Sequence, residues 1–114
     1  MSTVNEYFES LRGKSVAVIG MGVSNTPLIR MMLRAGLKVT VCDKAPRERV
    51  EELAGELESL GAKLRLGPDY LEKLSRFDVI FRTPGLNPNN PKVQEALQSG
   101  SILTSEMELF FQLC

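Results

Sequence analysis

The chain has 114 residues, of which 43% are hydrophobic and 25% are charged. This length and composition are those of one folded domain, spanning 1–114, and leave no room for two. Basic and acidic side chains number 14 each, so the net charge is zero and argues against a nucleic-acid partner. The sequence contains no histidine, which excludes Ser-His-Asp and Cys-His catalysis and every metal site that needs an imidazole.

Neither the cysteines nor the first residues indicate an exported or membrane-bound protein. Cys42 and Cys114 lie too far apart for a Cys-x-x-Cys zinc or redox motif, and Cys42 ends an apolar run that predicts a buried strand thiol. The first residues lack the basic and apolar regions of a signal peptide, and no stretch approaches the ~18 apolar residues of a membrane span. We therefore expect a cytoplasmic protein with no membrane contact.

Short β-branched apolar runs alternate with longer amphipathic segments, and Gly, Pro or Asp separates them. This alternation is typical of strand–helix units built on a parallel sheet. Strands are predicted at 15–19, 38–42, 63–66, 78–81 and 102–104. Helices are predicted at 26–35, 46–60 and 91–99, with a shorter one around 70–74 and a last one that begins at a capping box formed by Ser105 and Glu108. In the helix at 91–99, Leu97 is predicted on the buried side with Val93 and Ala96.

Right-handed crossovers between these units leave few possible topologies. We predict an α/β fold of the Rossmann-like, doubly wound class, with a five-stranded parallel sheet in the order 3-2-1-4-5 and helices on both faces. The strand at 63–66 then lies at a sheet edge. In such a sheet a ligand binds outside the carboxyl ends of the strands, near the switch point between the first and fourth strands.

The first candidate motif joins the first strand to the next helix and reads Gly20-Met21-Gly22-Val23-Ser24-Asn25. Gly20 permits a tight turn, and Gly22 lets a pyrophosphate approach the backbone. The amides of Val23, Ser24 and Asn25 then face the ligand from a helix start, where the dipole favours an anion. Asn25 replaces the third glycine of the dinucleotide motif, so either the helix is displaced or the side chain is a cap or ligand contact. The alternative is an ordinary strand–helix turn.

The second motif is Asp43, which follows the second strand. A carboxylate at this spacing accepts hydrogen bonds from ribose hydroxyls or from the N3–H of uracil. The next two backbone amides, of Lys44 and Ala45, can donate to carbonyl oxygens. The alternative is a solvated charge or a cap for the helix that begins at Pro46, and the two roles can coexist.

The third motif, Thr83-Pro84-Gly85, follows the fourth strand. It places a hydroxyl and a glycine amide across the crevice from the first loop. From spacing alone, a proline-fixed turn is the favoured interpretation, so the loop becomes informative only beside the other two motifs.

Taken together, the motifs are similar to those of a known family. The runs at 13–24, 41–43, 83–86 and 102–110, in this order and spacing, resemble the amino-terminal domain of the Mur ligases of peptidoglycan synthesis. The resemblance covers almost the whole chain.

The resemblance implies that this domain binds the UDP part of UDP-N-acetylmuramoyl-L-alanine. The first loop would hold the diphosphate, the end of the second strand would hold uracil, and the third loop would lie along the diphosphate and sugar. The candidate UDP-substrate-binding residues are Gly20, Gly22, Val23, Ser24, Asn25, Asp43, Lys44, Ala45, Thr83, Pro84 and Gly85.

The family reaction needs ATP, but the chain contains no Gly-x-x-x-x-Gly-Lys-Ser/Thr phosphate loop. The resemblance therefore implies that ATP, Mg²⁺ and D-glutamate bind in a central and a carboxyl-terminal domain beyond residue 114. Residues 1–114 would then hold no cofactor, metal or catalytic residue. Their partners would be the UDP-substrate and those two domains. Two rivals stay open. One is an NAD(P)-binding domain of a dehydrogenase or redox-sensing module, and the other is a non-catalytic interaction domain that binds no nucleotide.

Overall fold

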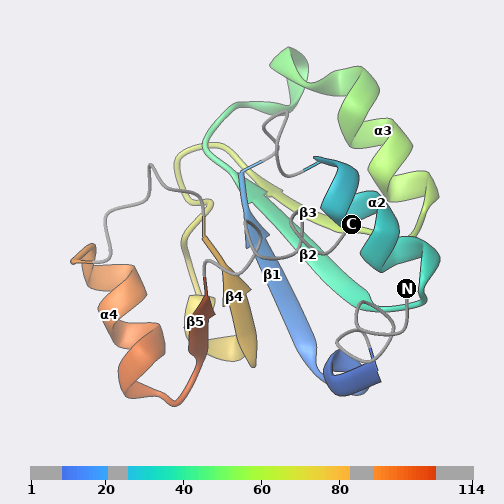
Figure 1. Cartoon of the computed structure of the whole chain (residues 1–114). Coiled ribbons are helices and arrows are strands. Elements are labelled where there is room, and N and C mark those ends of the chain that lie inside the picture. The colour runs from blue at the N-terminus through green and yellow to red at the C-terminus, as the bar shows by residue number, and fades with distance from the viewer. Residues whose placement is uncertain (1–8, 21–25, 83–88, 105–114) are drawn as a thin grey trace.

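The computed structural model describes residues 9–20, 26–82 and 89–104 (Figure 1). Its centre is a five-stranded parallel sheet in the order β3-β2-β1-β4-β5. The strands are β1 (Ser15–Ile19), β2 (Lys38–Asp43), β3 (Lys63–Leu66), β4 (Val79–Phe81) and β5 (Ile102–Thr104). The predicted fold class, the strand order and the edge position of 63–66 are therefore confirmed.

Helices lie on both faces of the sheet, as the sequence predicts. The helices α2 (Thr26–Arg34) and α3 (Glu51–Ser59) cover one face, and α4 (Pro91–Gln98) and the turn containing η2 (Leu74–Arg76) lie on the other (Figure 1). Two hydrophobic cores lie on the two faces of the sheet, the first under α2 and α3 and the second under α4 and η2. Side chains alternate along β1, so Val16 and Val18 belong to the first core and Ala17 and Ile19 belong to the second. All four are buried, which explains why this strand reads as a continuous apolar run.

The end of α2 and the start of α4 follow from single residues. Gly36 adopts a φ of 85° directly after α2, in the left-handed region where a glycine is least costly. Asn90 caps α4, because its side-chain oxygen accepts a hydrogen bond from the Lys92 N–H at 2.9 Å. Pro91 then occupies the first helical turn, where the missing N–H costs nothing.

The segment 46–60 differs from the single helix predicted. It forms a short 3-10 helix, η1 (Arg47–Arg49), and then α3, and Val50 between them has a φ of −128° and a ψ of 25°. Arg47 bridges the two pieces through ion pairs with Glu51 at 3.5 Å and Glu58 at 2.6 Å. Val50 packs beside the first core while α3 buries Leu57, so tertiary packing outweighs the local helical pattern here.

Two smaller expectations are wrong as well. The segment around 70–74 forms turns that lead into η2, with Lys73 at a left-handed φ of 59°, rather than an α-helix. Leu97 is 38% exposed, because α4 packs on η2 and the β4–β5 side of the sheet and buries only Val93 and Ala96. The predicted capping box at 105–108 lies outside the described residues. Among the helices that are described, none has the length and apolar character needed to cross a bilayer.

Candidate functional site

The carboxyl ends of β1, β2 and β4 meet at the edge where the sequence places the ligand. Ile19 pairs with Cys42 across β1 and β2, and Val18 pairs with Phe81 across β1 and β4. Gly20 and Asp43, the next residues on neighbouring strands, therefore lie at the same level. The Gly20 N–H donates to the Cys42 carbonyl at 2.6 Å, which joins the two strand ends. The chain runs from β1 toward β3 on one side and resumes at β4 on the other, so this edge contains the switch point.

Gly20 makes the turn that leads out of β1. Its φ of 99° lies where a residue with a β-carbon is strained, as the tight turn predicted at this glycine requires. The helix α2 begins six residues later at Thr26 and has no acidic residue in its first turn. The positive end of the α2 dipole is therefore not offset by a carboxylate of that turn, as a site for an anion requires.

Asp43 ends β2 and organises the loop that follows it. Its Oδ1 accepts a hydrogen bond from the Ala45 N–H at 2.9 Å, and its backbone carbonyl accepts one from the Gly67 N–H at 3.0 Å. The carboxylate thus closes its own turn, and η1 begins at Pro46, which provides no side-chain cap. The Lys44 N–H donates to none of the described residues, so this amide is available to a ligand.

Sequence reasoning did not single out Gly67, which ties the ends of β2 and β3 together. Gly67 is buried with a φ of 96°, and its N–H holds the Asp43 carbonyl. The available signal was a glycine directly after the predicted strand at 63–66, a position that marks a turn with positive φ.

Cys42 lies one residue before Asp43 but is not a reactive group. Its side chain is fully buried, and burial raises the pKa of the thiol to about 11. Almost no thiolate is present near neutral pH, which agrees with the predicted structural role. Across the described part of the chain, no three acidic or cysteine side chains come together as a metal site would require.

The remaining predicted contacts fall on two loops that the structure does not describe. Gly22, Val23, Ser24 and Asn25 lie in the undescribed segment 21–25, and Thr83, Pro84 and Gly85 lie in the undescribed segment 83–88. The described residues on either side fix where these loops leave the fold. The first joins Gly20 to Thr26, and the second follows the half-buried Arg82 at the end of β4. Both loops therefore start at the edge that contains Gly20 and Asp43.

A parallel sheet in this order, with a glycine turn after β1 and a carboxylate after β2, defines a Rossmann-like α/β domain. Solved structures support this class. The chain is similar to a putative oxidoreductase from Pseudomonas putida, with a TM-score of 0.55 and 21% identity over 88% of this chain and 36% of that one. It is also similar to a shikimate 5-dehydrogenase from Mycobacterium fortuitum, with a TM-score of 0.54 and 15% identity over 93% of this chain and 51% of that one. At these identities the likeness shows the fold alone.

The family is shown by sequence. Residues 14–105 match the family described as "Mur ligase MurD-like, N-terminal domain", and the chain belongs to this family. It is 46% identical to a UDP-N-acetylmuramoylalanine--D-glutamate ligase of Ruminiclostridium cellulolyticum, over 97% of this chain and 24% of that protein. It is also 46% identical to the ligase of the same name from Clostridium novyi, over 98% of this chain and 24% of that protein. The chain thus spans about a quarter of the length of these relatives.

Proposed function

We propose that the chain binds the UDP end of UDP-N-acetylmuramoyl-L-alanine and acts as the first domain of an ATP-dependent D-glutamate ligase of peptidoglycan synthesis. The observation that carries this proposal is the position of Gly20 and Asp43, which directly follow the paired residues Ile19 and Cys42 on neighbouring strands beside the switch point. Membership of the MurD-like family and the name shared by the relatives support the same ligand.

The diphosphate is assigned to the loop after β1. Gly20 turns the chain toward α2, and a phosphate group beside the following amides would meet the positive end of that helix. In this proposal Gly22 lets the phosphates approach the backbone, and the amides of Val23 and Ser24 donate to them. The role of Asn25 is either a cap of α2 or a ligand contact.

The uracil is assigned to the end of β2. The Asp43 carboxylate can accept from the uracil N3–H, and the Lys44 N–H can donate to a uracil carbonyl. The Ala45 N–H already donates to Asp43 Oδ1, so it orients the carboxylate unless the ligand displaces that bond. Thr83, Pro84 and Gly85, the next residues but one after β4, are assigned in this proposal to contacts with the diphosphate and sugar.

The chemical work of the chain is anchoring. Contacts to the nucleotide supply binding energy far from the reacting carboxylate and hold that carboxylate where the rest of the ligase acts on it. ATP and Mg²⁺ are assigned to the parts of the ligase outside these 114 residues, where the phosphorylated carboxylate would be attacked by the amine of D-glutamate. The proposal includes a cytoplasmic location for the protein.

Calorimetry of the chain with UDP and with NAD tests the proposal. We expect saturable binding of UDP and none of NAD. Asp43→Asn keeps an oxygen that can accept from the Ala45 N–H but removes the charge, so UDP affinity should fall about tenfold, the value of one charge-assisted hydrogen bond. Glu95→Gln on the distant helix α4 is the matched control and should bind UDP like the wild type. Tight binding of NAD without a response to UDP would favour the dehydrogenase class instead.

A further inference from the structure

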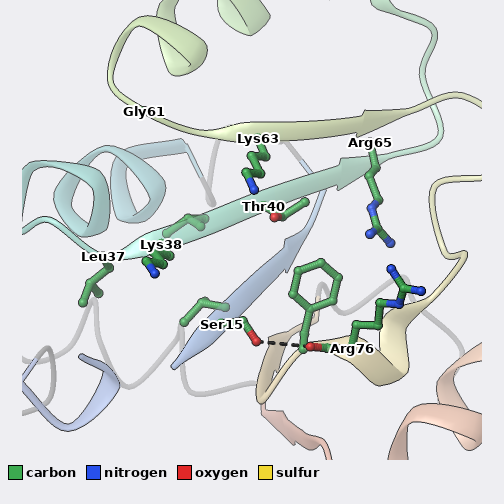
Figure 2. Close-up of a pocket in the computed structure, with 11 residues that line it drawn as sticks. Ser15, Leu37, Lys38, Thr40, Gly61, Lys63, Arg65 and Arg76 are labelled. Carbon is green, nitrogen blue, oxygen red and sulfur yellow. Dashed lines mark hydrogen bonds between the residues drawn. The ribbon is translucent and has the colours of Figure 1, made fainter. Parts of the chain in front are cut away.

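A second concave site lies on the other half of the molecule, near the amino ends of β1, β2 and β3. It is a cavity of about 430 Å³ (Figure 2). Its walls come from the first residues of the three strands and from the turn before β4, including Ser15, Lys38, Lys63 and Arg76. The candidate uridine diphosphate site is at the carboxyl ends of β1 and β2. The two sites share no residue, and they come nearest at Arg65, which pairs with Cys42, the residue before Asp43.

Four cationic side chains line this cavity: Lys38, Lys63, Arg65 and Arg76. Strand register explains their convergence. Thr40 pairs with Lys63 and Cys42 pairs with Arg65, so both basic residues of β3 lie on the face of Thr40, away from α3. Figure 2 shows Lys63 and Arg65 extending from β3 on the side of Thr40, toward the segment that carries Arg76.

No carboxylate balances these cations in the described part of the chain. None of the four makes an ion pair there, and no acidic residue lines the cavity. The two nearby carboxylates already have partners, one of them Ser15 of the cavity wall. Asp78 accepts from the Ser15 N–H at 2.9 Å, and the Glu72 carboxylate pairs with Lys92 at 3.1 Å. Because the whole chain has zero net charge, this concentration of positive charge is a local feature.

The walls of the cavity are held by a ring contact and by hydrogen bonds to backbone carbonyls. These contacts do not neutralise the four positive charges. The Arg65 guanidinium lies over the buried Phe77 ring, 5.1 Å from its centroid, and also donates to the Glu72 backbone carbonyl. The Ser15 hydroxyl donates to the Arg76 carbonyl at 3.2 Å, as the dashed line in Figure 2 marks. Arg65 and the backbone at Arg76 are therefore held in place before any ligand arrives, which lowers the cost of binding.

We propose that this cavity is a binding site for a compact, multiply charged phosphate compound. Its volume is in the range of small-molecule sites and is too small for a folded partner. Two guanidinium groups offer the forked donor geometry that phosphate oxygens accept, and two ammonium groups add point charge. The Thr40 hydroxyl on the cavity floor supplies a neutral donor.

Tripolyphosphate is the probe, and backbone amide shifts of the isotopically labelled chain locate it. We expect saturable shifts at 38–40, 61–65 and 76–77 that persist when UDP is present in excess. Lys63→Gln combined with Arg65→Gln should weaken the affinity at these amides about tenfold or more, since two charge-assisted contacts are lost. Arg76→Gln lies on a separate segment and should weaken it independently. Arg49→Gln, which removes an exposed cation of η1, is the matched control and should change nothing.

Three outcomes would overturn the proposal. The first is a set of shifts confined to Gly20 and Asp43, which would mean that the probe occupies the other end of the sheet. The second is an unchanged affinity in the Lys63 and Arg65 double variant and in Arg76→Gln. The third is a stronger response of the same amides to a glutamate-rich peptide than to tripolyphosphate, which would identify an acidic protein segment as the ligand.

Discussion

The two faces of β2 and β3 differ in what covers them. On one face, Val39 and Val41 of β2 and Leu64 and Leu66 of β3 pack under α2 and α3. On the other face, Thr40 and the basic side chains of β3 border a cavity, and the described elements of that layer pack mainly on β1, β4 and β5. The same two strands therefore supply stability with one face and a polar, charged surface with the other.

The apolar and charged faces can belong to the same short strand because successive side chains point to opposite faces of the sheet. Along β3, Leu64 and Leu66 alternate with Lys63 and Arg65, so four consecutive residues serve both faces. β1, at the centre of the sheet, has no such freedom after its first residue, because residues 16–19 are buried on both faces. An edge strand can therefore carry charge where a central strand cannot.

The largest expected effect comes from the covered face. Leu57 of α3 is fully buried against the first core, so Leu57→Ala should lower the free energy of unfolding by about 2–5 kcal/mol. On the opposite face, Arg65→Ala loses the contact with the Phe77 ring and should cost only about 0.5–1 kcal/mol. Urea unfolding followed by circular dichroism measures both. Equal losses would contradict the division of the two faces.

The second prediction tests whether water reaches the face of β2 that borders the cavity. Cys42 is on the same face of β2 as Thr40, yet burial raises the pKa of its thiol to about 11. Because the folded thiol keeps its proton to a higher pH than the unfolded one, its contribution is complete below about pH 9 and is lost as the pH rises through about 11. The loss should be about 2–3 kcal/mol.

The measurement is the slope of the free energy of unfolding against pH, between about pH 9 and about pH 11. Cys42→Ala removes the titrating group and leaves every other ionisable group in place, so its slope should be shallower than that of the wild type. Identical slopes would show that water reaches the Cys42 thiol and that the face is wetter than the structure indicates.

The layout of the sheet was predictable because its signals are local. Each strand is a short apolar run, and glycines such as Gly36 mark helix ends through their own backbone conformation. The turn at Gly20 and the carboxylate at Asp43 were found in the same way, because a site at strand ends inherits its position from the strand boundaries.

The failures concern interactions between distant segments. The break at Val50 accompanies the packing of Val50 and α3 on the first core and an ion pair from Arg47 to Glu58, neither of which a hydrophobic pattern contains. The exposure of Leu97 depends on which side of the sheet α4 covers. The cationic cavity needs the register of β2 against β3, and that register becomes visible only once the strands are paired.

The third prediction compares two glycines in different backbone conformations. Gly20→Ala places a β-carbon at a φ of 99° and should cost about 1–2 kcal/mol, with weaker UDP binding. Gly55 lies within α3, and a β-carbon there would meet no atom within 4 Å, so Gly55→Ala should stabilise the chain by about 0.5–1 kcal/mol. Thermal unfolding of the two variants gives the signs. A stabilising Gly20→Ala would mean that the turn is not set by this residue.

The smallest effect is expected for the ion pair that joins the two helices of the covered face. Arg30 of α2 donates to Glu56 of α3 through Nε at 2.6 Å and Nη2 at 2.9 Å, and this contact lowers the pKa of the Glu56 carboxyl. Because the lowered pKa belongs to the folded state, the contribution is complete above the usual glutamate pKa and is lost as the pH falls below that value and through the lowered pKa. Glu56→Gln should cost little, since the pair is exposed and salt-screened, and the cost should vanish in 1 M NaCl. A large loss of unfolding free energy that persists in 1 M NaCl would mean that the orientation of α3 depends on this pair and not on Leu57. The exposed ion pair, and not the buried core, would then hold α3 on the covered face.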